Sequence, residues 1–315
     1  MPLTPGLPGT IAARPAADRE VNAQINRLMT MLREFAGFRA SNQIQLKLQK
    51  VFSNMPAKDF SAWLQAVEKD PQRTDLVALV EDLTNHETYF FREMVHLEAL
   101  RQHVLPALVQ AKARQAGAHR LVLWSAACSS GEEVYTLAMI ALEVLASQGF
   151  AREQAPGEYV LSPGWSLEVH GSDISRQAIR LAKEAMYCSR EDGLSSFRKF
   201  PQPYLRFFTE AGAPTHADTG NTRRYYKVKP QLARYCQFRV FNLVSRIAFL
   251  RDIDVVFCRN VLIYIDNAAQ KAIVQMLADA LQPEGVLFLG LVDAPETAGA
   301  VVKHALPQCV IYRKP

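Results

Sequence analysis

The sequence predicts an α/β fold: a mostly parallel sheet with helices on both faces, preceded by a small helical domain. Two observations support this prediction. In the later part of the chain, short apolar runs rich in β-branched or aromatic residues alternate with helical stretches, as in parallel sheets. In the earlier part, apolar residues recur at helical spacing. The chain has 315 residues, of which 49% are hydrophobic, so it can bury a substantial core.

The first 83 residues divide into a tail and a set of helices. Four prolines interrupt residues 1–18, which also lack the continuous apolar core of a signal peptide, so we expect a disordered tail there. Residues 19–83 are expected to form the helical domain, with Ser41, Asp59 and Thr74 as helix N-caps. The apolar positions that predict these helices are Val21, Ile25, Leu28, Leu32 and Phe35, followed by Phe60, Trp63, Leu64 and Val67.

Residues 84–315 are expected to hold the sheet. The predicted strands are 121–124, 167–169, 235–241, 253–257 and 286–289, and the predicted helices between them are 132–146, 176–186 and 268–281. Residues from about 187 to 234 break this alternation, because they contain several prolines and a Gly/Thr/Asn turn. We interpret them as a small inserted β-subdomain with a hairpin. In such a fold, ligands bind at the carboxyl ends of the parallel strands.

Composition excludes several classes of protein. The 36 basic and 31 acidic residues give a net charge of +5, too small an excess to imply nucleic-acid binding. The five cysteines are widely spaced and form no CxxC pair, so we predict neither a metal site nor a disulfide framework. Free thiols fit a reducing cytoplasm. No apolar run is long enough to span a membrane, so we expect a cytoplasmic protein without direct membrane insertion.

The stretch 124–133 follows a predicted strand and opens a predicted helix. Its small residues let the backbone approach a ligand closely, and Gly131 can adopt dihedrals that other residues avoid. It lacks the GxGxxG dinucleotide fingerprint. Glu132 and Glu133 at the helix start would repel a phosphate, so a cationic ligand such as S-adenosylmethionine fits better. The alternative is a structural turn whose carboxylates interact favourably with the helix dipole.

Three further stretches carry polar residues at the end of a predicted strand or at the start of a predicted helix. Asp173 ends the second strand, where it could accept hydrogen bonds from both ribose hydroxyls of a nucleoside or could cap the next helix. Arg259 and Asn260 leave a later strand and are costly to bury unpaired, although a satisfied polar cluster would also explain them. Thr88 and Arg92 are expected on one face of a helix. The aromatic pair Phe90 and Phe91 is expected in the core.

Taken together, these stretches resemble the chemotaxis-receptor methyltransferase family, CheR, over about residues 20–313. The matching segments, in the family's order and spacing, are His86–Arg92, Trp124–Thr136, Gly171–Ser175, Asn242–Leu243 and Phe257–Tyr264. The resemblance implies an N-terminal helical domain and a Rossmann-like S-adenosylmethionine-dependent methyltransferase domain with the inserted β-subdomain. No N/D-P-P-Y motif of amino-directed methyltransferases occurs.

The resemblance also implies roles for individual residues. Arg92 and Tyr264 match positions that assist at the reacting centre. The residues that match cofactor-binding positions are His86, Thr88, Arg92, Ala126, Glu133, Asp173, Asn242, Leu243, Arg259 and Asn260. The chain departs from the family pattern at some positions. His86 replaces an Asn that contacts the cofactor, Ala127 replaces a Gly, and Gly290-Leu-Val-Asp293 replaces G-H-S-E.

The activity implied by the resemblance is methyl transfer to glutamate side chains on a helical, glutamate-rich cytoplasmic region of a chemoreceptor-type protein, with S-adenosylhomocysteine as product. The family's receptor-facing helix usually carries several arginines, and Lys47 and Lys50 stand in that region here. Two other hypotheses compete: a methyltransferase for a different substrate, and a CheR-like sensor or scaffold that binds the cofactor without catalysis. The weak basic charge and the lack of a stacking motif disfavour nucleic acid as substrate. Retention of Arg92, Arg259, Asn260 and Tyr264 disfavours the sensor.

Overall fold

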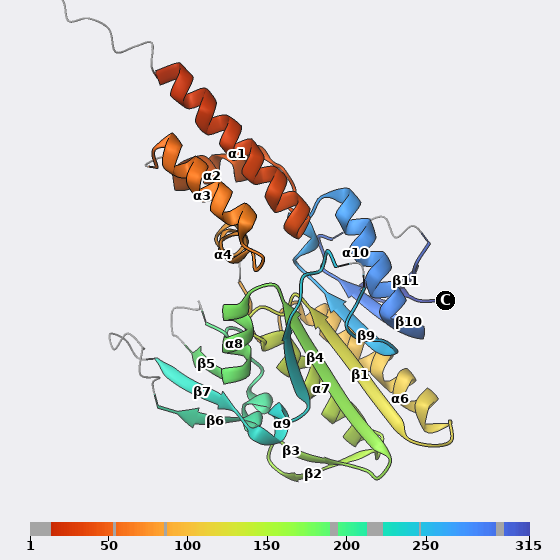
Figure 1. Cartoon of the computed structure of the whole chain (residues 1–315). Helices are drawn as coiled ribbons and strands as arrows, with labels where there is room; N and C mark the ends of the chain where they lie inside the picture. The colour runs from red at the N-terminus through yellow and green to blue at the C-terminus, as the bar shows by residue number, and fades with distance from the viewer. Residues whose placement is uncertain are drawn as a thin grey trace, which may run out of the picture. The chain divides into compact units, whose positions relative to one another are not determined.

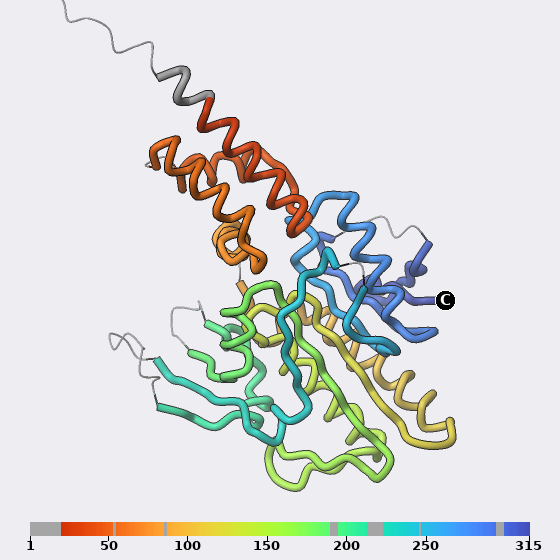
Figure 2. Tube along the Cα trace, in the orientation of Figure 1, coloured from red at the N-terminus to blue at the C-terminus, as the bar shows by residue number. Residues whose placement is uncertain are grey.

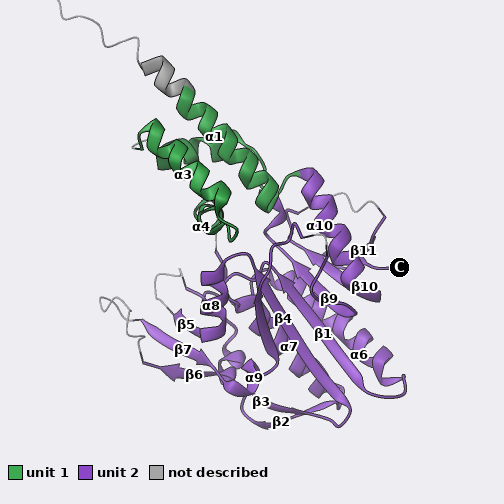
Figure 3. Ribbon diagram, viewed as in Figure 1, with its two compact units in different colours: residues 1–85, 264–266 green, residues 86–263, 267–315 purple. Residues whose placement is uncertain are grey.

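The computed structural model describes residues 14–52, 55–84, 87–189, 195–212, 223–245, 247–293 and 299–315 (Figures 1 and 2). The chain divides into two compact units (Figure 3). One comprises residues 1–85 with 264–266, and the other comprises residues 86–263 with 267–315. In the described part of the chain, no helix combines the length and the apolar character that crossing a membrane requires.

In the part of the first unit that the structure describes, the chain forms four helices. They are α1 (Arg14–Ala36), α2 (Asn42–Phe52), α3 (Ala57–Lys69) and α4 (Thr74–Leu83). Their core contains six of the nine apolar residues whose spacing predicts the helices, among them Ile25, Leu28 and Phe60. The other three, Val21, Phe35 and Trp63, are only partly buried. The Phe52 ring stacks on Phe60 with centroids 4.3 Å apart. Residues 264–266 belong to this unit because Phe38 forms a β-bridge with Ile265.

One of the three predicted helix caps is confirmed. Ser41 Oγ accepts a hydrogen bond from the Ile44 amide at the start of α2. The prediction for Asp59 is wrong, because the N-cap of α3 is Pro56. The helix begins at Ala57, so Asp59 already lies in its first turn. The prediction for Thr74 is also wrong, because Thr74 is already helical and its amide donates to the Asp70 carboxylate at 2.7 Å.

The second unit contains a seven-stranded sheet with the order β11-β12-β10-β9-β1-β4-β8. The five central and edge strands that pair in parallel are β1 (His119–Ala126), β4 (Trp165–Asp173), β8 (Cys236–Val240), β9 (Ile253–Cys258) and β10 (Leu281–Leu289). The strands β11 (Val302–Ala305) and β12 (Val310–Arg313) are antiparallel and close one side. The predicted mostly parallel sheet is therefore confirmed.

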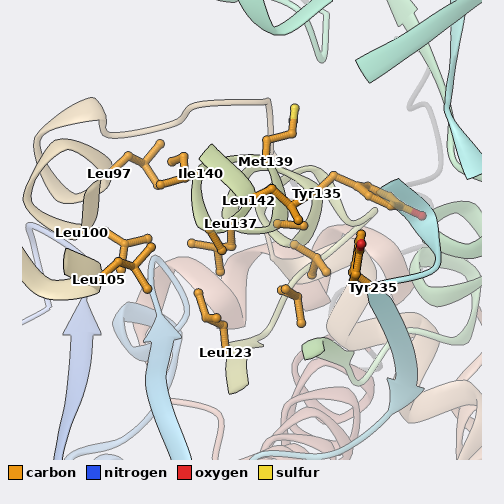
Figure 4. Packing of buried hydrophobic residues seen from close by; sticks show 14 of the residues in the cluster. Leu97, Leu100, Leu105, Leu123, Tyr135, Leu137, Met139, Ile140, Leu142 and Tyr235 are labelled. Atoms are coloured by element: carbon orange, nitrogen blue, oxygen red, sulfur yellow. The ribbon is translucent and has the colours of Figure 1, made fainter. Parts of the chain in front are cut away.

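Helices pack on this sheet and bury its apolar side chains. They are α5 (Met94–Ala99), a π-helical turn (Leu100–Val104), α6 (Leu105–Ala113), α7 (Glu132–Ser147), α8 (Arg176–Glu184), α9 (Pro230–Ala233) and α10 (Asn267–Ala280). Two 3-10 turns span Gln202–Phe207 and Leu262–Tyr264. Figure 4 shows α7 side chains such as Leu137 and Ile140 packed among Leu100, Leu105 and Leu123. The near-continuous apolar sequence of α7 reflects its burial on almost every side.

The insertion folds into a three-stranded antiparallel sheet rather than a single hairpin. Its order is β5 (Met186–Ser189), β7 (Arg224–Val228) and β6 (Phe208–Ala211). The helix α8 ends earlier than its predicted limit because Ala185 adopts a left-handed conformation with φ 55°. A further hairpin, β2 (Ala151–Ala155) with β3 (Glu158–Leu161), was not predicted by the sequence.

Candidate functional site

Three loops with polar side chains meet at the carboxyl edge of the parallel sheet. They follow β1, β4 and β9, and the strand register aligns their starting points: Ser125 pairs with Gly171 on one side and with Phe257 on the other. This edge is where open α/β sheets bind ligands. The structure therefore brings the segments beginning at Ala127, Asp173 and Arg259 together.

The loop after β1 has an unusual backbone. Ala127 and Ser129 lie in the left-handed region at φ 70° and 48°, which is sparsely populated by residues other than glycine. The amides of Ala127 and Cys128 donate to the carbonyl of Ser172 on β4, at 2.8 and 2.9 Å. Gly131, at φ 94°, precedes α7, and a Cβ there would lie 2.8 Å from Ala182 Cβ. The hydrogen bonds to β4 thus hold this loop in a backbone conformation that is left-handed at two residues other than glycine.

Asp173 joins the loops that follow β1 and β4. Its Oδ2 accepts a hydrogen bond from the Ser129 amide at 2.8 Å, and its Oδ1 accepts one from the Ser175 amide at 3.0 Å. The N-cap of α8 is Ser175, whose Oγ accepts from Ala178 N at 2.9 Å, so Asp173 does not have the helix-cap role. Asp173 therefore ties the loop after β1 to the start of α8.

A buried ion pair links α7 to the end of β9. Arg259 donates through Nε and Nη2 to Glu133 Oε2, at 2.7 and 2.6 Å, and its side chain is 2% exposed. The other oxygen of Glu133 accepts from Ser125 Oγ at 2.7 Å. Arg259 Nη1 donates to the Arg92 carbonyl at 3.0 Å. Every guanidinium nitrogen of Arg259 therefore has a hydrogen-bond or ion-pair partner inside a polar cluster. One of these contacts ties Arg259 to the backbone of Arg92.

Two carboxylates of this cluster were missed by the sequence analysis. Glu93 Oε1 accepts from Asn260 Nδ2 at 2.8 Å, and Asp293 Oδ2 accepts from the Asn260 amide at 3.1 Å. Glu93 directly follows the 86–92 stretch. Its position next to that motif is the feature of the sequence that could have identified it as a site residue. Asp293 lies in the 290–293 segment that departs from the family pattern. Burial raises the pKa of Asp293, while amide donors such as Asn260 N oppose that rise.

The segment before α5 is not helical. The prediction that Thr88 and Arg92 share a helix face is wrong, because Phe91 and Glu93 have left-handed backbones at φ 59° and 55°, and α5 starts only at Met94. Arg92 donates through Nη1 to the Glu87 carbonyl. The burial predicted for the aromatic pair is confirmed: Phe90 and Phe91 lie in the core.

The remaining predicted site residues have different surroundings. Ala126 is the fully buried last residue of β1. Asn242 and Leu243 follow β8, and the preceding Phe241 amide donates to the Asp173 carbonyl at 2.9 Å. Tyr264 belongs by its contacts to the helical unit, where its carbonyl accepts from the Arg39 amide at 2.8 Å. His86 lies outside the described residues.

The electrostatics of Glu93 give a testable pH dependence. Burial acts to raise its pKa, but the His96 ring 3.2 Å away and the charge of Arg259 outweigh burial and lower it from 4.5 to about 2. A lowered carboxyl pKa stabilises the fold above the unfolded-state pKa, and this stabilisation is lost as the pH falls toward the folded-state value. The stability advantage of wild type over Glu93→Gln is expected to shrink by about 2 kcal/mol between about pH 5.5 and pH 3. Urea unfolding at several pH values measures it, and a constant difference would contradict the assignment.

Comparison with known proteins places the second unit in a family. Residues 86–304 match the family model described as CheR methyltransferase, SAM binding domain. Chemotaxis protein methyltransferase 1 of Pseudomonas aeruginosa is 31% identical over 275 residues, which cover 86% of this chain and 88% of that protein. Chemotaxis protein methyltransferase Cher2 of Pseudomonas putida is 29% identical, covering 86% and 88% of the two chains. The chemotaxis protein methyltransferase of Escherichia coli is 28% identical, covering 85% and 83%. This chain belongs to the CheR methyltransferase family, and the segment that matches is its S-adenosylmethionine-binding domain.

Proposed function

We propose that this protein transfers the methyl group of S-adenosylmethionine to glutamate side-chain carboxylates of a chemoreceptor-type protein. The products are glutamate methyl esters and S-adenosylhomocysteine. The observation that carries the proposal is the buried network of Glu133, Arg259, Asn260 and Glu93 at the carboxyl edge of a CheR-family sheet. The names of the relatives, all chemotaxis methyltransferases, support a receptor as the substrate.

The chemistry of the donor set fits this cofactor. The Asp173 carboxylate lies against a loop with a single glycine, Gly131, and Glu132 and Glu133 follow that loop, which suits a ligand with hydroxyl groups and without phosphate. When bound, S-adenosylmethionine supplies an activated methyl group on a sulfonium. The residues proposed to hold it are His86, Thr88, Arg92, Ala126, Glu133, Asp173, Asn242, Leu243, Arg259 and Asn260.

The protein's own contribution to the reaction is alignment and charge. A glutamate carboxylate is ionised at neutral pH, so no general base is needed to activate it. Fixing the carboxylate and the methyl group in line can supply about 7–11 kcal/mol at best. In the proposed mechanism the Arg92 guanidinium neutralises the incoming carboxylate, and the Tyr264 hydroxyl orients it by a hydrogen bond.

Cofactor binding is the first experimental test of the proposal. Calorimetry with S-adenosylmethionine and S-adenosylhomocysteine is expected to give micromolar or tighter dissociation constants, which correspond to about −8 kcal/mol or more favourable. Absence of heat with both ligands at high protein concentration would overturn the proposal. Binding followed by no transfer to any receptor region would instead favour a cofactor-binding sensor.

Substitution of Tyr264 by Phe separates chemistry from binding. The change removes one hydroxyl and little volume. We expect kcat to fall about tenfold while the dissociation constant of S-adenosylmethionine stays unchanged, because the hydroxyl acts on the reacting carboxylate. Steady-state methylation kinetics and calorimetry on the same preparation measure the two quantities. Equal turnover in both proteins would remove Tyr264 from the mechanism.

The helix α2 carries a surface suited to an acidic, amphipathic helix. Leu46 and Val51 are 64% and 56% exposed, although both are large apolar residues. Lys47 and Lys50 are exposed between them. At 100° per residue, all four side chains fall within one side of the helix. Apolar anchors with basic residues between them suit a helix that is both amphipathic and rich in glutamate.

The double variant Lys47→Glu/Lys50→Glu tests this surface. We expect receptor methylation to slow about tenfold at low salt, with a smaller defect at high salt, because opposite charges steer association. The matched control is Lys58→Glu/Lys69→Glu, which makes the same charge change at exposed positions of α3. Cofactor binding should be unchanged in both double variants. Equal methylation rates in the two would show that receptor recognition lies elsewhere.

A further inference from the structure

Both the backbone amide and the side-chain amide of Asn260 are held by hydrogen bonds to carboxylates. Its backbone is left-handed at φ 60°, and its amide donates to Asp293 Oδ2 at 3.1 Å. Its side-chain nitrogen donates to Glu93 Oε1 at 2.8 Å. A Cβ on Gly290 would lie 2.8 Å from Asn260 N and 3.4 Å from Asn260 Nδ2, so the neighbouring loop packs closely against both groups. Strained residues that their surroundings hold at several points cluster at functional sites.

Glu93 is itself positioned for this contact rather than for its own helix. It occupies the N-cap of α5, yet its side chain makes no capping hydrogen bond. Instead, its second oxygen lies 3.3 Å from Arg259 Nη1 and 3.2 Å from His96 Nδ1. The side chain is 15% exposed, and its two oxygens contact Asn260 on one side and Arg259 and His96 on the other.

The chemistry of this contact decides which way the Asn260 amide faces. The charge and hydrogen bonds around Glu93 keep it ionised at neutral pH, since its pKa is about 2 against the burial that opposes ionisation. An ionised carboxylate only accepts hydrogen bonds. The nitrogen of the Asn260 amide must therefore face Glu93, and the carbonyl oxygen must face away from it. Two orientations of an asparagine are ordinarily close in energy, and here one of them would set two acceptors against each other.

We propose that Glu93 is a positioning residue that locks the Asn260 amide so that its carbonyl oxygen is presented to the cationic amino-acid portion of the bound cofactor. A carbonyl oxygen accepts from an ammonium group, whereas an amide nitrogen would repel it. The inference rests on the proposed function, because it concerns the same cofactor. It adds a residue to the site and assigns the orientation of Asn260.

The test is an exchange of donor and acceptor between the two residues. In Glu93→Gln the amide of Asn260 can face either way, and we expect S-adenosylmethionine to bind about tenfold more weakly. Asn260→Asp sets two carboxylates in contact, and a loss of at least tenfold is expected. In the double variant Glu93→Gln/Asn260→Asp, the new amide at position 93 donates to one oxygen of the new carboxylate at position 260 and leaves the other oxygen presented as before. The double variant has the wild-type size and net charge, and its affinity should return to within about threefold of wild type.

Calorimetry with S-adenosylmethionine and S-adenosylhomocysteine reads out the exchange, alongside thermal unfolding of each variant. Both ligands carry the ammonium group, so both should lose affinity in the single variants and regain it in the double variant. A role in stability alone predicts that the unfolding temperature falls and recovers while the affinity of each folded variant stays that of wild type. Losses that add in the double variant, or a Glu93→Gln protein that binds as wild type does, would overturn the inference. If one single variant does not fold, the double variant is compared with the other single variant: affinity nearer to wild type supports the inference, and equal or lower affinity overturns it. Failure of the wild type to bind either ligand would instead overturn the proposed function.

Discussion

Replacing Arg259 with Met is expected to abolish cofactor binding and to lower the free energy of unfolding by about 3–5 kcal/mol. The guanidinium is the shared partner of two carboxylates, Glu133 and Glu93, and it also binds the Arg92 carbonyl. Methionine replaces much of its volume but none of its charge. The two carboxylates would be left close together with their main cation removed, which is the costly way to break a buried ion pair.

Chemical denaturation and calorimetry measure the two effects of Arg259→Met. The matched control is Arg120→Met, which removes another two-point arginine–glutamate pair: Arg120 contacts Glu168 at 2.6 and 2.8 Å, but its side chain is 45% exposed. That change should cost about 1 kcal/mol or less and leave cofactor binding intact. Adding Glu133→Gln to Arg259→Met should recover part of the lost stability, because it removes one unpaired charge. Equal losses of stability and of cofactor affinity in the two arginine variants would show that the Arg259 ion pair matters no more than an exposed one.

Asp173→Ala is expected to weaken S-adenosylmethionine binding about a hundredfold. Two effects combine. Any hydrogen bonds from the ribose hydroxyls to the carboxylate are lost, at about 1.5–3 kcal/mol each for a charged acceptor. The amides of Ser129 and Ser175 also lose their acceptor, so the loops after β1 and β4 are no longer tied together. Asp173→Asn retains one acceptor oxygen and should lose less affinity than the alanine variant.

The control for Asp173 is Asp279→Ala on α10, where an exposed aspartate accepts from Gln275 Nε2 at 2.9 Å. Its affinity for the cofactor should equal that of wild type. A folded Asp173→Ala protein with unchanged affinity would reduce Asp173 to a link between loops, without a part in binding.

The sequence predicted the parallel sheet and the meeting of its motifs for a simple geometric reason. Parallel strands share one carboxyl edge, so Asp173, Arg259 and the loop that starts at Ala127 had to approach one another once the strands were identified. The near-continuous apolar run of α7 likewise required burial. These conclusions depend on local patterns of hydrophobicity, which a single sequence displays.

The partners inside the site could not be predicted in the same way. Glu93 and Asn260 are 167 positions apart, and nothing in either local pattern indicates that one donates to the other. The left-handed backbone at Phe91 and Glu93 also overrides the helical spacing of Thr88 and Arg92. Such conformations persist only when tertiary contacts hold them, and those contacts are not visible in sequence spacing. The third strand of the inserted subdomain, β5, was missed because it begins directly where α8 ends.

Glutamate methylation is tested most directly by transfer of a labelled methyl group. Tritiated S-adenosylmethionine is incubated with the protein and the purified cytoplasmic region of a chemoreceptor from the same organism. We predict label in the receptor fragment that mild alkali releases as methanol, and mass spectrometry that places the methyl group on glutamate side chains. Base-stable label, or label on another residue type or on a small molecule, would contradict glutamate as the acceptor. No transfer from a protein that binds the cofactor would contradict catalysis itself.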